Sequence, residues 1–127
     1  KRQDVYITNM IKCRPPNNRD PLPGEIEACR PYLDRQLEMI APKVIVTLGR
    51  YSFSKFFPDE AIGKARGKPR RWNGRLLYPI YHPAAALHNP QLRSTIESDF
   101  KRLPALLERS VQPPEEPEEQ VEQLSLF

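Results

Sequence analysis

The sequence has few of the features that mark membrane or secreted proteins. No apolar run approaches the roughly 18 residues that a membrane-spanning helix needs. Two cysteines are too few for the disulfide bonds that would stabilise a secreted fold of 127 residues. The chain also begins without the charged-then-apolar pattern that directs export. We therefore expect a cytoplasmic protein with no membrane partner.

Positive and negative charges are distributed unequally along the chain, whose net charge is +4. All 20 Lys and Arg lie within residues 1–110, with 11 of the 16 acidic residues, whereas the last 17 residues hold five Glu and no base. A basic body favours a polyanionic partner, and a plain soluble basic domain is the alternative. We expect one domain over residues 1–110. Residues 111–127 should form a disordered tail, because their Pro- and Glu-rich part cannot bury apolar area.

Hydrophobic patterns predict strands that alternate with helices. Apolar and β-branched runs predict strands over residues 5–8, 44–48 and 76–81. Helical spacing predicts helices over residues 23–40, 49–57 and 90–108, and Pro31 should interrupt or begin the first of them. The inner face of the last helix should contain Leu92, Ile96, Phe100, Leu103, Leu106 and Leu107. This alternation predicts an α/β fold around a parallel sheet.

Two polar side chains directly follow predicted strands. Asn9 comes after the first strand and His82 after the third. Since the carboxyl ends of parallel strands share one edge, the two side chains could meet in one pocket. An amide can pair with the edge of a nucleobase, and an imidazole can donate to an oxygen that gains negative charge. The alternative is a capping Asn and a turn His before Pro83.

Cys13 and Cys29 are separated by 15 residues and do not form a CxxC motif. A zinc or iron–sulfur site usually needs four protein ligands, so two buried structural thiols are the simpler interpretation of the spacing. Lys12 and Arg14 flank Cys13 and would stabilise a thiolate there.

The segment 63–75 holds six basic residues and no acidic one. Lysine and arginine contact phosphates, and glycine permits close approach of the backbone. We predict that this segment binds nucleic acid, with a solvated charge run as the alternative. The residues that we assign to DNA contact here are Lys64, Arg66, Gly67, Lys68, Arg70 and Arg71. Trp72 could stack on a base or anchor the segment to the core.

Several motifs together resemble the iron–sulfur, family 4 type of uracil-DNA glycosylase. The TNxxKCRPPxNR motif begins at Thr8, and the HPAA motif begins at His82. Between them lie Cys29, the run 42–49 and the GKxRG sequence of residues 63–67, in matching order. The resemblance covers nearly all of residues 3–107.

The resemblance implies specific roles for these residues. The Asn that matches Asn9 reads the edge of uracil, and the His that matches His82 hydrogen-bonds a uracil carbonyl. Cys13 and Cys29 match two of the four ligands of a 4Fe–4S cluster, and Pro83 of the HPAA motif joins the DNA-contacting set. The implied fold is a three-layer α/β/α sandwich around a short parallel sheet, in a protein that flips the base out of the duplex.

The sequence departs from the family pattern at its beginning. The family starts with another cysteine pair, then a GEAPG-type loop that places the hydrolytic machinery, then an aromatic residue that stacks on uracil. None of these occurs here, and the first strand, normally central, is also missing. We therefore expect an N-terminally truncated portion of the enzyme, which by itself lacks the loop that places the hydrolytic machinery.

The chain ends in QLSLF, which resembles the pentapeptide that binds the bacterial sliding clamp. The four side chains that we assign to the clamp are Gln123, Leu124, Leu126 and Phe127. The apolar ones would fill pockets of the clamp, and the tail would tether the protein near DNA. A frayed amphipathic end is the alternative.

Together these features predict a monomeric base-excision repair enzyme that acts on uracil-containing DNA. It would hydrolyse the N-glycosidic bond of deoxyuridine and leave an abasic site. The alternative is a catalytically incomplete, clamp-tethered DNA-binding module on the same scaffold.

Overall fold

A computed structural model describes residues 1–11 and 16–111. Two short 3-10 turns, η1 (Arg2–Asp4) and η2 (Pro16–Asn18), lie near the beginning of the chain. The strands are β1 (Val44–Leu48), β2 (Arg70–Trp72) and β3 (Arg75–Ile80). The helices are α1 (Pro23–Ile40), α2 (Arg50–Phe56), α3 (Ile62–Ala65), α4 (Ala85–His88), α5 (Leu92–Lys101) and α6 (Leu103–Val111). Among the described residues, no helix is long and apolar enough to cross a membrane.

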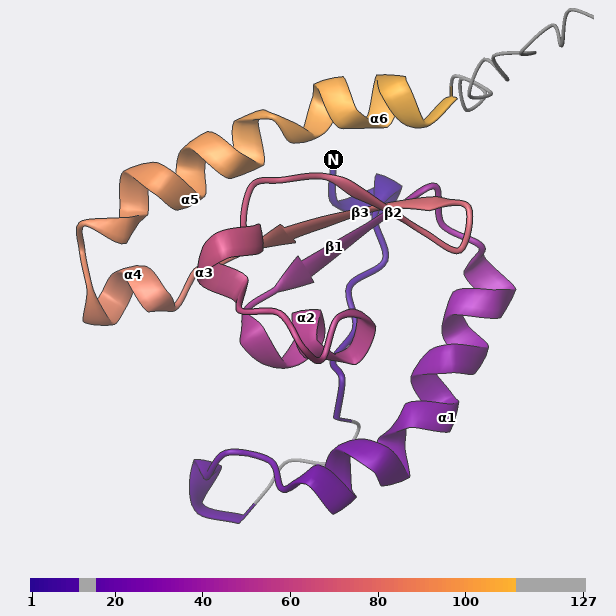
Figure 1. Ribbon diagram of the computed structural model, residues 1–127, viewed down its shortest axis with the longest axis vertical. Helices are drawn as coiled ribbons and strands as arrows, with labels where there is room; N and C mark the ends of the chain where they lie inside the picture. Colours follow the sequence, from indigo (N-terminus) through magenta and orange to yellow (C-terminus); the bar gives the residue numbers. More distant parts are fainter. Residues whose placement is uncertain (12–15, 112–127) are drawn as a thin grey trace, which may run out of the picture.

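The sheet has the strand order β1-β3-β2 (Figure 1). β1 and β3 are parallel, with Val44 opposite Leu76 and Leu48 opposite Ile80, as the apolar runs predict. β2 pairs antiparallel with residues 75–77 of β3, so the sheet is mixed rather than wholly parallel. Pro79 lies in the central strand but beyond the part that β2 reaches, so its missing N–H does not interrupt that ladder. The predicted α/β class is therefore confirmed.

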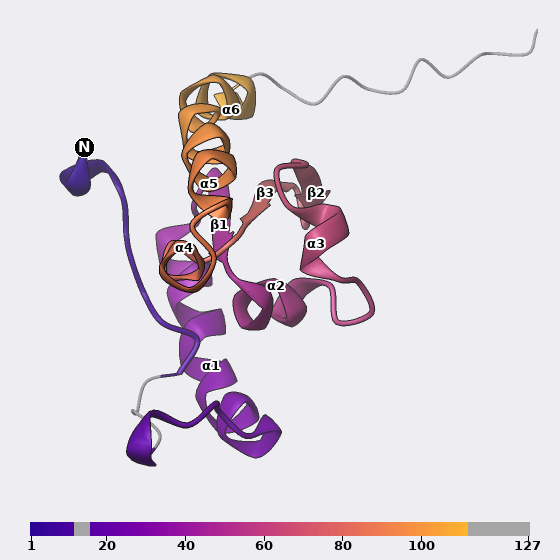
Figure 2. The same cartoon turned by 90° about the vertical axis from the view of Figure 1, so that its left-hand side faces the viewer.

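Helices cover both faces of the sheet, which gives three layers. Alternate residues of β3 (Leu76, Tyr78 and Ile80) pack with Leu103 and Leu106 of α6. Leu77, which points to the opposite face, packs with Phe53 of α2 and Ala65 of α3. Figure 2 shows α5 and α6 on one side of the strands and α3 on the other. This arrangement is the α/β/α sandwich that the family resemblance implies.

The predicted strand over residues 5–8 is wrong for this structure. Val5, Tyr6 and Ile7 are 52–63% exposed, and their backbone pairs with no strand among the described residues. In Figure 2 the segment runs along the side of the molecule opposite α3. Strand-forming residues need a neighbouring strand that supplies hydrogen-bond partners and a surface to cover. Here the segment instead contacts α1, which extends away from the sheet (Figure 1).

The single helix predicted over residues 90–108 is two helices, α5 and α6. They meet at Arg102, and Pro104 occupies the first turn of α6, where its missing N–H costs nothing. The predicted inner face is also partly wrong, since Phe100 and Leu107 are 38% and 50% exposed whereas Asp99 is buried. The basic segment 63–75 likewise is not a plain loop, because it contains most of α3 and all of β2.

Candidate functional site

The carboxyl ends of the parallel strands β1 and β3 are joined by backbone contacts. The Gly49 amide, directly after β1, donates a hydrogen bond of 2.9 Å to the carbonyl of Ile80. Gly49 has φ 86° and ψ 177°, a conformation that is essentially restricted to glycine. A Cβ placed on Gly49 would lie 3.3 Å from the Cβ of His82. The turn after β1 therefore supports the backbone of the predicted site histidine.

His82 is exposed at this edge, and one of its ring nitrogens is already committed. The Ala84 amide donates to Nδ1 of His82 at 3.0 Å. A nitrogen that accepts a hydrogen bond carries no proton, so the proton of the neutral ring lies on Nε2. Nε2 can therefore donate a hydrogen bond to an oxygen atom. The turn that follows is closed by a 2.9 Å bond from the Ala85 amide to the His82 carbonyl, and Pro83 lies exposed within it.

Asn9 is exposed on the segment that runs beside α1. Gln36 of α1 holds this segment, because its amide nitrogen donates to the hydroxyl of Tyr6 at 3.2 Å and its oxygen accepts from Thr8 at 3.3 Å. Asn9 therefore comes from a segment anchored to α1 rather than from the end of a strand. That Asn9 and His82 share one pocket stays a prediction.

Cys29 is a half-buried residue of α1. Cys13 lies outside the described residues, so the relation between the two cysteines is a prediction. Among residues 1–11 and 16–111, no group of three or more His, Cys, Asp or Glu side chains is placed to hold a metal ion.

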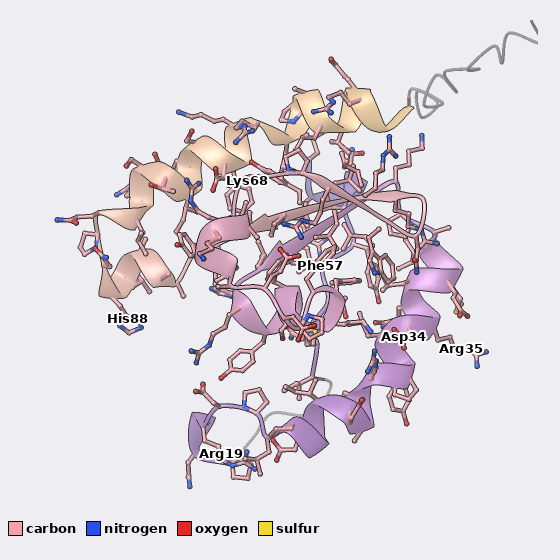
Figure 3. All side chains as sticks on the ribbon, viewed as in Figure 1. Arg19, Asp34, Arg35, Phe57, Lys68 and His88 are labelled. Atoms are coloured by element: carbon pink, nitrogen blue, oxygen red, sulfur yellow. The ribbon has the colours of Figure 1, made fainter. Side chains whose placement is uncertain are left out.

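The basic residues between 63 and 75 divide into two groups. Lys64, Lys68 and Arg71 are exposed, and Lys68 lies on the loop that follows α3 (Figure 3). Arg66 is engaged with the buried Asp99, and Arg70 donates to both carboxylate oxygens of Glu60 at 2.7 and 2.6 Å.

Arg70 and Trp72 also contact aromatic side chains beside the core. The Arg70 guanidinium lies 4.5 Å from the ring centre of Phe57, which is labelled in Figure 3. Trp72 packs edge-on against Phe56 with ring centres 4.7 Å apart, which favours its role as an anchor for the segment. The exposed cations are free to face a polyanion, whereas Arg66 and Arg70 first hold the segment in place.

A polar network around Asp99 was not found from the sequence. The carboxylate of Asp99 accepts two bonds from Nη1 of Arg66, at 3.0 and 2.8 Å, and its backbone carbonyl accepts from the Tyr78 hydroxyl at 2.9 Å. Burial raises the pKa of Tyr78 above its usual value, which keeps this hydroxyl protonated.

Gly67 and Arg102 complete the same network. Nη1 of Arg102 donates to the Gly67 carbonyl at 2.8 Å, and a Cβ on Gly67 would lie 2.8 Å from the Asp99 carboxylate. Glycine is thus required at residue 67 for close approach to Asp99. An acidic residue at an inward helical position is the sequence signal that could have revealed the network.

The four clamp-binding residues predicted near the C-terminus, Gln123, Leu124, Leu126 and Phe127, lie outside the described residues. Their role stays a prediction, as does the extent of the tail from residue 111.

Comparison with known proteins places these features in a family. The family model of the uracil DNA glycosylase superfamily matches residues 1–104. The chain belongs to this superfamily. It is 54% identical over 111 residues to a type-4 uracil-DNA glycosylase of Saccharolobus solfataricus. The aligned region covers 80% of this chain and 51% of that protein. Matches to proteins of the same name come from Archaeoglobus fulgidus (51% identity; 81% and 56% coverage) and Thermotoga maritima (40% identity; 86% and 59% coverage).

The chain spans little more than half the length of these relatives. The match covers the basic segment, the turn after β1 and His82, all of which lie within residues 1–104. The sequence prediction of family 4 is supported by the names of these relatives.

Proposed function

We propose that the chain is part of an enzyme that hydrolyses the N-glycosidic bond of deoxyuridine in DNA. The observation that carries this proposal is the bond from the Ala84 amide to Nδ1 of His82, because it leaves a proton on Nε2 at the exposed carboxyl edge of the sheet. The identity of more than half the aligned residues with proteins named type-4 uracil-DNA glycosylase supports the same reaction.

In this mechanism His82 stabilises the leaving base. The bond between C1′ and N1 breaks, its electron pair passes to the uracil ring, and a water molecule supplies the oxygen that bonds to C1′. Negative charge therefore gathers on the uracil carbonyl oxygens, and Nε2–H of His82 donates to one of them. Free uracil leaves, and an abasic site remains.

Asn9 supplies recognition of the base in this proposal. The flipped uracil presents a carbonyl acceptor at O4 beside the N3–H donor, and one amide side chain matches both. Cytosine presents a donor and an acceptor in the reverse order. Its binding would leave buried polar groups unpaired, so it is rejected.

The exposed cations Lys64, Lys68 and Arg71 would contact backbone phosphates of the substrate. Pro83 lies next to His82 and would contact the strand where the base leaves the stack. Arg66 would act close to the DNA while it holds Asp99, and Gly67 would lie beside it where its missing side chain leaves room for that carboxylate. Arg70 would act there while it holds Glu60.

A 4Fe–4S cluster is the cofactor that the family resemblance implies, and the residues of this chain do not complete it. The sequence holds two cysteines, whereas such a cluster takes four thiolates. We propose that Cys13 and Cys29 supply two ligands and that the other two, with the GEAPG-type loop and the first strand, lie outside the sequence given. A chromophore in the visible absorption of the full-length protein, lost on Cys29→Ser substitution, tests this assignment.

We further propose that residues 111–127 form a tether whose Gln123, Leu124, Leu126 and Phe127 bind the sliding clamp, and that the protein acts as a cytoplasmic monomer.

The second candidate function is a non-catalytic DNA-binding module with the same tether. It is favoured by the exposed cations Lys64, Lys68 and Arg71, which can contact phosphates without any catalytic group.

The direct test is release of uracil by the full-length protein from a single-stranded oligonucleotide that contains one deoxyuridine. We expect free uracil and an abasic site that alkali cleaves, with no release from the same oligonucleotide that contains deoxycytidine. Binding of the uracil oligonucleotide without release would instead establish the non-catalytic module.

A further inference from the structure

A polar depression of about 330 Å³ opens between the end of α3 and the side of α5. The side chains that line it are Arg66, Ser94, Thr95, Ser98, Asp99 and Arg102. Its walls thus combine two guanidinium groups, three hydroxyl groups and one carboxylate, with no apolar side chain. No sequence motif includes α5, and Arg66 of the GKxRG sequence is the one lining residue that belongs to a motif. The depression contains neither of the predicted base-binding residues, Asn9 and His82.

The charges of the depression leave a surplus of one positive charge. The side chain of Asp99 is 3% exposed, and both of its carboxylate oxygens accept hydrogen bonds from one nitrogen of Arg66. Arg102 lies 4.0 Å from the same carboxylate and uses Nη1 to bond the Gly67 carbonyl. A guanidinium has five N–H donors, so most donors of both arginines remain available. Their side chains are 34% and 54% exposed, which lets a ligand reach them from solvent.

The hydroxyl groups lie on one side of α5. Ser94 and Ser98 are one helical turn apart, and Thr95 is adjacent to Ser94. None of the three hydroxyls forms a side-chain hydrogen bond to another residue in the part of the chain that the structure describes. They therefore add donors beside the arginines without a structural task of their own.

Paired guanidinium and hydroxyl donors are the groups that bind a tetrahedral phosphate. Two features favour a phosphate of DNA over a free one. The exposed Lys64 and Lys68 flank Arg66 in the sequence and extend the positive surface beyond the depression. The Gly67 amide donates to the Pro79 carbonyl at 2.7 Å, which ties this wall to the end of β3, three residues before His82.

We propose that this depression binds one backbone phosphate of the DNA strand that is presented to His82. That this strand is the uracil-containing substrate rests on the proposed function. Arg102 and the hydroxyls of Ser94, Thr95 and Ser98 are the contacting groups, and Asp99 fixes Arg66 beside them.

The test uses the full-length protein and a uracil-free single-stranded oligonucleotide, with affinity measured by fluorescence anisotropy over a range of salt concentrations. Each phosphate contact to a single strand contributes about 0.7 to the slope of log K against log salt concentration. We expect Arg102→Gln to reduce the slope by about this amount. Lys101→Gln, an exposed change at the preceding residue and outside the depression, should leave the slope near the wild-type value.

A second pair of variants tests the same surface without removing a structural contact. Ser98→Asp and Ser98→Asn have the same shape, and only the aspartate adds a negative charge. We expect the aspartate variant to bind at least tenfold more weakly than the asparagine variant at low salt. Equal midpoints of thermal unfolding would show that the two variants are folded alike.

Three results would overturn the proposal. Equal slopes for Arg102→Gln and wild type, or equal affinities for the two Ser98 variants, would show that no DNA phosphate occupies the depression. Inorganic phosphate that binds the wild type but not Arg102→Gln, without a change in DNA affinity, would assign it to a free anion. These measurements use DNA without uracil, so they test the phosphate site independently of excision. Failure of uracil release would contradict the proposed function but would not affect the interpretation of the salt slopes.

Discussion

Gly49 and His82 lie close together at the ends of two parallel strands. A Cβ on Gly49 would lie 3.3 Å from the Cβ of His82 and 3.9 Å from its amide nitrogen. The Gly49 amide is also bonded to Ile80, two residues before His82. The position of the proposed catalytic imidazole therefore depends on a glycine more than 30 residues earlier in the chain.

Substitution of this glycine should disturb the site. Gly49→Ala forces an alanine to adopt φ 86°, at a cost of about 1–3 kcal/mol, and pushes its methyl group toward His82. We expect a lower unfolding midpoint and a loss of excision rate. Gly24→Ala is the matched control, because a Cβ on Gly24 of α1 meets no atom within 4 Å. If both variants unfold and react like the wild type, the support of His82 by Gly49 is refuted.

The ion pair between Arg66 and Asp99 should be asymmetric in its effect on stability. Arg66→Gln leaves the carboxylate of Asp99 buried without its main partner, whereas Asp99→Asn leaves Arg66 with access to water. We expect Arg66→Gln to lower the free energy of unfolding by about 3 kcal/mol, and Asp99→Asn by less. Urea denaturation measures both, with the exposed Arg71→Gln as a control that should change little. The reverse order of the two losses would count against this account of the network.

The beginning of α1 should contribute stability that depends on pH. Hydrogen bonds from Arg19, and then from the Leu22 amide, lower the pKa of Glu25 from 4.5 to about 2. A lowered carboxyl pKa stabilises the fold fully above the unfolded value, and this contribution is lost as pH falls from about 4.5 toward about 2.

The difference in melting temperature between wild type and Glu25→Gln measures this contribution. It should be present at pH 7 and vanish near pH 2. Glu38→Gln is the control, since Glu38 is exposed on the same helix. A difference for Glu25→Gln that persists unchanged into strong acid would show that the ion pair is not its source.

Removal of the last five residues should abolish clamp binding and spare catalysis. Leu126→Ala with Phe127→Ala should have the same effect as the deletion, because these side chains would fill the apolar pockets of the clamp. Ser125→Ala is the matched control and should bind normally. Binding is measured by pull-down with the clamp, and excision on a short oligonucleotide. Clamp binding that survives the deletion would remove the basis for the proposed tether.

The sequence predicted those elements whose residue types indicate their surroundings in the fold. The run 44–48 is apolar except for Thr47, which suits a strand that lies between two helical layers, and it forms a strand where predicted. Residues 5–8 have a similar composition but pair with no strand in the part of the chain that the structure describes, and they lie exposed. Composition reports that a segment can form a strand and does not report whether a neighbour is present.

The charges of the basic segment show the same limit. No acidic residue lies between 63 and 75, which favoured a polyanionic partner for every base in it. In the fold, however, Asp99 approaches Arg66 from α5, and Glu60 approaches Arg70 from before α3. Pairing between residues 33 positions apart is set by tertiary packing, and a local count of charges cannot predict it.

The most direct test of the account compares the two histidines of the chain. His82 carries the proposed Nε2 donor, whereas His88 is an exposed residue of α4 that projects away from the body of the molecule (Figure 3). In the full-length protein, His82→Ala should reduce the single-turnover rate of uracil release by roughly 10²–10³-fold and leave DNA affinity unchanged, because a transition-state donor is lost. His88→Ala should leave both quantities unchanged. Uracil release at the wild-type rate by His82→Ala, or an equal loss of rate in both variants, would contradict the proposed role of His82.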